Sequence, residues 1–69
     1  MRISARNQIK GTVIEVKKGA TTSHVLVDIG GGQIITSSIT NEAVDDLAIK
    51  AKSSVIVVVK ASDVMIAVD

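Results

Sequence analysis

The amino-acid sequence predicts an all-β fold, a five-stranded barrel with one short helix between strands 3 and 4. Short apolar stretches rich in valine and isoleucine recur along the chain, separated by clusters of glycine, lysine and threonine. A single polar stretch carries the signals of a helix start. A chain of 69 residues has room for one small core, so residues 1–69 are predicted to form a single domain.

The first predicted strand spans residues 9–16 and contains a glycine. Gly11 lies in the strand interior, where glycine usually marks a bulge, a barrel bend or the close approach of another backbone. Residues 17–22 then interrupt the apolar pattern with two lysines, a glycine and two threonines. Residues 17–22 are predicted to form a turn or short loop.

The second and third strands are predicted at residues 23–29 and 33–39, joined by Gly30, Gly31 and Gly32. Three glycines can adopt positive φ freely, which favours a tight hairpin. A phosphate-binding glycine loop is the alternative. It is disfavoured because the Lys-Ser/Thr continuation and the following helix of such loops are missing.

The one predicted helix covers residues 40–47. Thr40 or Asn41 can serve as the N-cap, because the side-chain oxygen of either residue can accept from the first free backbone N–H groups. Val44 and Leu47 are three positions apart and share one helix face. We expect these two side chains to plug the open end of the barrel.

The last two strands are predicted at residues 55–59 and 64–68, separated by a polar break at residues 60–63. The first of them is an unbroken β-branched run, which predicts burial on both faces. Five strands with a short helix between the third and fourth follow the order of an OB-type barrel.

Composition limits both the stability and the function of this domain. The chain has no aromatic residue and no cysteine, so neither buried aromatic rings nor disulfides stabilise it, and oligomerisation is expected to supply the missing stability.

No segment reaches the roughly 20 apolar residues that span a bilayer, and no signal peptide is evident. A soluble, cytoplasmic protein is expected. The formal net charge of +1 does not predict a broad nucleic-acid-binding surface.

Donor-rich segments near the two termini predict a local anion site instead. Residues 4–11 combine hydroxyl, guanidinium, amide and ammonium groups just before and within the first strand, and residues 60–63 add a second donor-rich segment. We expect the two segments to hold a small tetrahedral dianion. Because so small a domain without aromatic residues is expected to be only marginally stable as a monomer, this site is expected to lie across a subunit interface.

Three segments resemble the Mop proteins, or molbindins, a family of small molybdate-binding proteins: residues 4–7 with Gly11, residues 38–40 and residues 58–66. The similarity covers essentially the entire chain. It implies an OB-like barrel assembled as a homo-oligomer, a hexamer built as a trimer of dimers. It also implies molybdate or tungstate as the bound ligand at subunit interfaces, and a role in intracellular molybdenum storage and homeostasis.

The matching positions carry the chemistry that an oxyanion needs. A fully oxygenated dianion offers only acceptors, so it requires several donors from different segments. One lysine and one arginine match its charge, and hydroxyl and backbone N–H groups can complete the shell. No carboxylate or imidazole cluster is present for a bare cation. The resemblance implies as oxyanion-binding residues Ser4, Arg6, Thr40, Lys60, Ala61 and Ser62.

Two positions depart from the family pattern, and a second site is also implied. Ala43 and Ala61 stand where some relatives carry serine, so only their backbone N–H groups can donate. The resemblance also implies a second oxyanion site near a threefold axis, involving Gly19, Ala20 and Thr22.

Other functions have less support in the sequence. Catalysis is not expected, because there is no histidine–carboxylate pair, no cysteine and no serine with an activating base. A nucleic-acid-binding OB module remains an alternative, although the aromatic stacking platform of such modules is absent. The other alternative is a purely structural assembly subunit, indifferent to oxyanions.

Overall fold

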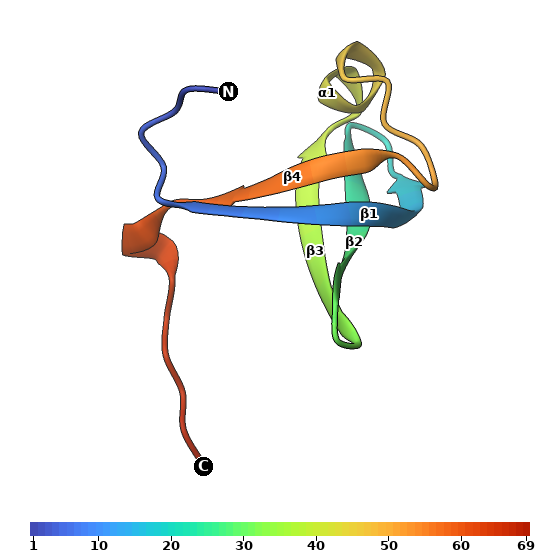
Figure 1. Ribbon diagram of the computed structural model, residues 1–69. Coiled ribbons are helices and arrows are strands. Elements are labelled where there is room, and N and C mark those ends of the chain that lie inside the picture. The colour runs from blue at the N-terminus through green and yellow to red at the C-terminus, as the bar shows by residue number, and fades with distance from the viewer.

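A computed structural model describes all residues from 1 to 69 as one antiparallel sheet with a short helix (Figure 1). The strand order in the sheet is β3-β2-β1-β4. The elements in chain order are β1 (Asn7–Lys18), β2 (Thr22–Gly30), β3 (Gln33–Thr40), α1 (Asn41–Asp46), β4 (Ser54–Val59) and a 3₁₀ turn, η1 (Ala61–Asp63). The all-β prediction with a single helix between the third and fourth strands is therefore confirmed.

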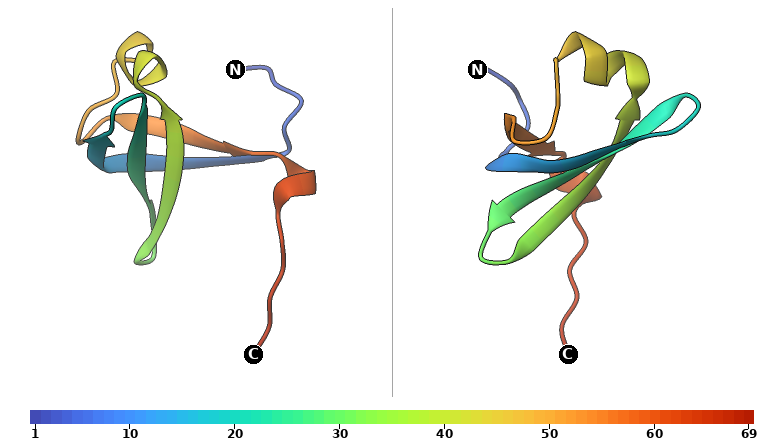
Figure 2. Two further views of the ribbon diagram at one scale, coloured as in Figure 1. Left: turned by 180° about the vertical axis from the view of Figure 1, so that it is seen from behind. Right: turned by 90° about the vertical axis from the view of Figure 1, so that its right-hand side faces the viewer.

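Strand β1 organises the sheet because it pairs with a different strand along each half. Its first half pairs with β4, from Asn7 opposite Val59 to Thr12 opposite Ser54. Its second half pairs with β2, and the register shifts between Val13 and Glu15. A bulge of this kind increases the local twist. The sheet curves strongly as a result, and the β1–β4 pair forms an arm that projects from the β2–β3 hairpin (Figure 2).

Gly11 lies at a tight contact between β1 and β2. A Cβ atom on this residue would lie 2.5 Å from Val27 Cγ1 and 2.8 Å from the Asp28 carbonyl oxygen. The prediction that Gly11 marks a close approach of another strand is confirmed. Next to it, the core consists of four valines, Val13, Val25, Val27 and Val44.

The hairpin between β2 and β3 forms as predicted. Gly31 and Gly32 are the two loop residues, with φ of 61° and 77°, and Gly30 pairs with Gln33. Positive φ at both loop positions is the type I′ pattern that matches strand twist. Asp28 accepts a hydrogen bond from the Gly30 amide at 2.8 Å, which helps to fix the turn.

Helix α1 begins where predicted, but it covers the core with one side chain instead of two. The Thr40 hydroxyl oxygen accepts from the Ala43 amide at 3.1 Å, so Thr40 is the N-cap. Val44 is buried, whereas Leu47 is 67% exposed. The prediction that Leu47 plugs the barrel is wrong for this chain, because the helix ends at Asp46 and leaves Leu47 outside the core.

The prediction of a fifth strand and a closed barrel is also wrong for the single chain. After β4, η1 turns the chain away, and residues 64–69 run outward from the sheet as an extended tail (Figure 1). Their one backbone hydrogen bond joins the Val64 amide to the Ala61 carbonyl within the turn. The sheet therefore has four strands and stays open between β3 and β4.

Strand β4 is buried on one face only, which corrects the expectation of two buried faces. Val55, Val57 and Val59 are partly buried, whereas Ile56 and Val58 are 44% and 41% exposed. A single sheet layer with one small helix cannot cover both sides of a strand. The unbroken β-branched run therefore places apolar side chains on an open surface.

No helix of this chain has the length and apolar character that a bilayer crossing requires.

Candidate anion-binding site

The tip of the β1–β4 arm gathers the predicted donors from both ends of the chain. Asn7 opens β1 and pairs with Val59, the last residue of β4. The residues just beyond this pair, Arg6 and Lys60, therefore lie side by side, with Ser4 a short distance along the N-terminal segment. Figure 1 shows that segment and η1 leaving the same tip. The geometry thus joins two segments more than 50 residues apart in sequence.

The side chains at this tip are free to bind a ligand. Ser4, Arg6, Lys60 and Ser62 are exposed, and none takes part in a side-chain hydrogen bond within the chain. The one ion pair joins Lys18 and Asp45, whose Nζ and Oδ1 atoms are 3.1 Å apart. The arginine and lysine at the tip therefore form no ion pair with a carboxylate of the same chain, although Asp63 lies nearby in η1.

Backbone donors are also available at the tip. The η1 turn is closed by the Asp63 amide donating to the Lys60 carbonyl at 2.9 Å. Outside the helix and strands, no backbone hydrogen bond uses the amides of Ala61 or Ser62 as donor. Ala61 has no side-chain hydroxyl, but its N–H group is not used as a donor in the turn and can donate to an oxyanion.

Thr40 lies at the opposite end of the molecule from the tip. It pairs with Thr22 at the start of β2, and Ser23 of that strand pairs with Lys18 at the far end of β1. The 12 residues of β1 lie between this end and Asn7, a length along the strand of at most roughly 35 Å. Within one chain, Thr40 therefore cannot share a ligand with Arg6 and Lys60.

The residues of the implied second site lie close to Thr40. The Gly19 amide donates to the Thr22 carbonyl at 2.7 Å, which closes the turn that holds Gly19, Ala20 and Thr22. The Asn41 side chain donates to the Gly19 carbonyl at 3.0 Å and ties this turn to the start of α1. The Gly19 amide is therefore engaged within the turn, and the hydroxyls of Thr22 and Thr40 are side-chain donors at this end of β1.

The structure shows the polar support of this second group, which the sequence analysis missed. Ser23 is fully buried, and its hydroxyl hydrogen-bonds the side-chain oxygen of Asn41. The backbone N–H group of Asn41 donates to the Thr21 carbonyl at 3.0 Å. Asn41 thus holds β2, the turn and the helix start together. An asparagine directly after the N-cap threonine was the available sequence signal, but it indicated only a second possible cap.

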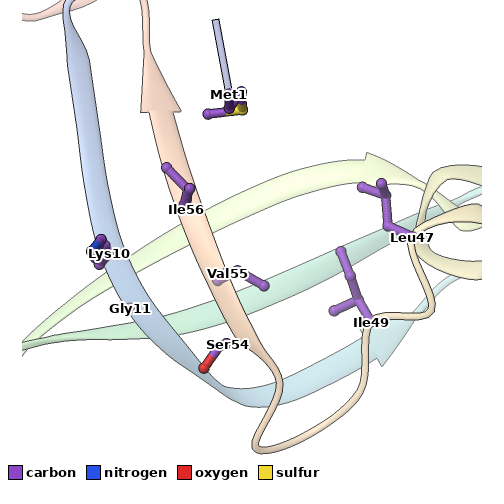
Figure 3. A pocket seen from close by; sticks show the side chains of 8 residues that line it. All are labelled: Met1, Lys10, Gly11, Leu47, Ile49, Ser54, Val55 and Ile56. Carbon is purple, nitrogen blue, oxygen red and sulfur yellow. The ribbon is translucent and has the colours of Figure 1, made fainter.

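An apolar groove beside β4 was also not predicted. Figure 3 shows Ile49, from the segment after α1, and Val55 of β4 pointing toward one another across it. Its lining also includes Met1, Leu47 and Ile56, and its volume is about 650 Å³. Apolar walls offer an oxyanion no hydrogen bonds, so this groove is not the anion site. No group of three histidine, cysteine, aspartate or glutamate side chains is placed to hold a metal ion.

Comparison with known proteins shows the family to which the sequence is similar. Residues 3–66 match the family model described as the TOBE domain. The chain is 47% identical over 66 residues to molybdenum-pterin-binding protein 3 of Clostridium pasteurianum, a match that covers 96% of this chain and 97% of the relative.

Solved structures share the fold. The chain matches MopII from Clostridium pasteurianum with a TM-score of 0.91 and 46% identity, over 97% of this chain and 100% of that one. It also matches the cytoplasmic molybdate-binding protein ModG, solved with molybdate bound, with a TM-score of 0.90 and 43% identity. That match covers 94% of this chain and 46% of the ModG chain.

Proposed function

Because the chain belongs to the TOBE-domain family, within the group of molybdenum-pterin-binding (Mop) proteins, we propose that it binds molybdate or tungstate as an intact oxyanion. The observation that carries this proposal is the arm tip. It brings an arginine, a lysine and two serine hydroxyls together with no carboxylate partner. Each of these groups can donate a hydrogen bond, and the oxyanion offers only acceptors.

The charges at the tip match the ligand. Arg6 can donate through two parallel N–H groups to a pair of oxygens, and Lys60 adds a compact point charge. Together they balance the two negative charges of the anion, so the loaded site is close to neutral. Ser4, Ser62 and the Ala61 amide then orient the remaining oxygens. A neutral, fully hydrogen-bonded site avoids the high cost of burying an unpaired charge.

The complete site requires more than one copy of the chain. Thr40 lies at the far end of β1 from Arg6, so it joins the arginine only if a second copy supplies it. Residues from two copies then surround the anion at their interface. A hexamer formed as a trimer of dimers supplies such interfaces repeatedly. The Gly19–Thr22 turns provide a second class of site where three copies meet.

The cellular role that fits these sites is storage. A protein of this kind binds molybdate in the cytoplasm, limits the free anion and releases it for molybdenum cofactor synthesis. Support for the location comes from ModG, a cytoplasmic molybdate-binding protein of the same fold. The protein acts as a binding protein and not as an enzyme.

Isothermal titration of the assembled protein tests this proposal. Molybdate and tungstate are expected to bind saturably, whereas phosphate should bind at least about 10-fold more weakly. Phosphate carries a proton at neutral pH, and the arginine, lysine and backbone N–H groups of the site cannot accept it, so only a serine or threonine hydroxyl could do so. Sulfate, a dianion of smaller size, is the matched control for charge. The proposal fails if neither molybdate nor tungstate shows saturable heat.

A further inference from the structure

Asn41 joins three segments that meet at one end of the sheet. Its side-chain Nδ2 atom donates to the Gly19 carbonyl at 3.0 Å, and its Oδ1 atom accepts from the Ser23 hydroxyl. Its backbone N–H group donates to the Thr21 carbonyl at 3.0 Å. Figure 2 (right) shows the turn of residues 19–22 projecting from the sheet beside the start of α1, where Asn41 lies. One residue therefore holds two carbonyl groups of this turn.

The orientation of the Asn41 side-chain amide is fixed by its two partners. The Gly19 carbonyl can only accept a hydrogen bond, so the NH₂ end of the amide must face the turn and the oxygen end must face Ser23. Ser23 is fully buried, so its hydroxyl has no contact with solvent and is committed to Asn41. The Ser23–Asn41 pair therefore keeps the NH₂ group directed at the Gly19 carbonyl.

The bond from Asn41 to Gly19 determines where the next N–H group points. In a trans peptide unit, the C=O of one residue and the N–H of the next point in opposite directions, and this chain has no cis peptide bond. Because the Gly19 carbonyl faces Asn41, the Ala20 N–H points away from Asn41. Ala20 is exposed, and its N–H donates to no group of the chain. The turn thus presents a free backbone donor in a fixed direction.

We infer that Asn41 is a positioning residue for the second class of oxyanion site, at the Gly19–Thr22 turns, and that Ser23 holds Asn41 in place. The inference rests on the proposed function, which assigns an oxyanion to these turns. The Asn41 side chain does not touch the anion, because its NH₂ group is used by the Gly19 carbonyl. It acts by fixing the Ala20 N–H before the anion arrives. A turn without this contact would lose more conformational freedom on binding, so its affinity would be lower.

The arm-tip site does not depend on this contact. Thr40, which a second copy supplies to the tip, is held by its pairing with Thr22 and by accepting from the Ala43 amide at 3.1 Å. Neither interaction uses the Asn41 side chain. Loss of that side chain is therefore expected to weaken the turn site and to spare the tip site.

NMR-detected titration of the assembled, isotope-labelled protein with molybdate tests this role. In the wild type, the amide signals of Ala20 at the turn and Ala61 at the tip are both expected to shift. Asn41→Ala should weaken the response of Ala20 by about 10-fold, the effect of one hydrogen bond, and that of Ala61 by less than about 3-fold. Asp45→Ala is the matched control, because it breaks the contact of α1 with Lys18 without touching the turn. It should leave both responses within about 3-fold of the wild type.

The possible outcomes separate the positioning role from the proposed function. An unchanged Ala20 response in Asn41→Ala, or an equal loss in Asp45→Ala, would overturn the inference and leave oxyanion binding intact. A wild type in which only Ala61 responds would overturn the inference and retain the tip site. A wild type in which neither amide responds would contradict the proposed function, and the inference with it.

A double variant separates positioning from stability. In Asn41→Ala the buried Ser23 hydroxyl loses its acceptor, so the melting temperature should fall. Ser23→Ala/Asn41→Ala also removes the unpaired hydroxyl, so its melting temperature should rise above that of Asn41→Ala. Its Ala20 response should stay about 10-fold weaker than in the wild type, because nothing holds the Gly19 carbonyl. Recovery of the Ala20 response together with the melting temperature would show that Asn41 acts only through stability and would overturn the inference.

Discussion

Replacing Arg6 with alanine is expected to weaken molybdate binding by about 30-fold, which corresponds to the roughly 2 kcal/mol of a hydrogen bond to a charged group. The substitution removes the planar donor fork and leaves the dianion with one matched positive charge. Arg6 is exposed and makes no side-chain hydrogen bond or ion pair in the unliganded chain. The apo protein should therefore keep its melting temperature, while the stabilisation by added molybdate becomes smaller.

Two further variants identify what the arginine contributes. Arg2→Ala removes the same side chain from the exposed N-terminal segment and should leave molybdate affinity unchanged. Arg6→Lys keeps the charge but not the fork, so its affinity should fall between those of the wild type and the alanine variant. Titration calorimetry and thermal melting at one fixed protein concentration measure all three. An unchanged affinity and an unchanged thermal response in Arg6→Ala would remove Arg6 from the site.

Replacing Gly11 with alanine is expected to destabilise the fold by about 2–3 kcal/mol, because the added methyl group overpacks a tight strand contact. The new Cβ would lie 2.5 Å from Val27 Cγ1 and 2.8 Å from the Asp28 carbonyl oxygen. The Val27 side chain can move away from the added methyl group, but the Asp28 carbonyl oxygen is part of the sheet backbone and cannot. For a domain of this size, such a loss lowers the melting temperature by about 10–20 °C.

The neighbouring residue provides the control for Gly11. Thr12 lies on the same strand with an exposed side chain, and Thr12→Ala should cost less than about 1 kcal/mol. Both variants are compared by thermal unfolding at equal protein concentration. A melting temperature of Gly11→Ala within about 3 °C of the wild type would show that β1 and β2 separate easily at this point.

The elements of the fold follow from local sequence, and its closure does not. Alternating side chains, the glycine hairpin and the Thr40 cap depend on neighbouring residues, and these features were predicted with boundaries close to those observed. The segment 64–68 has the correct composition for a strand, but pairing depends on where the preceding turn sends the chain. The η1 turn directs it outward, and no periodicity in the sequence encodes that direction.

Strand β4 shows a second limit of prediction from the sequence. A continuous run of β-branched residues indicates a strand, but it does not say whether the covering layer comes from the same chain. Ile56 and Val58 are exposed in the single chain because no element packs over that face. In sequence, apolar residues at an interface between chains look identical to residues of an internal core.

For the anion site, the sequence predicts the residue types and the resemblance to Mop proteins supplies their positions. The register of β1 and β4 then places Arg6 beside Lys60, a pairing that spacing alone does not reveal. Thr40 belongs to the other end of the same chain. The structure adds that these residues lie at the two opposite ends of β1. The proposed complete site therefore requires assembly of more than one copy.

Native mass spectrometry with and without molybdate tests most directly the claim that the oxyanion is held between copies of the chain. We expect an oligomer built from dimers, with bound oxyanion present on the assembled species and absent from any free monomer. Arg6→Ala should keep the assembly and lose bound anion. A monomer that carries molybdate at the same occupancy as the oligomer would contradict the interface site.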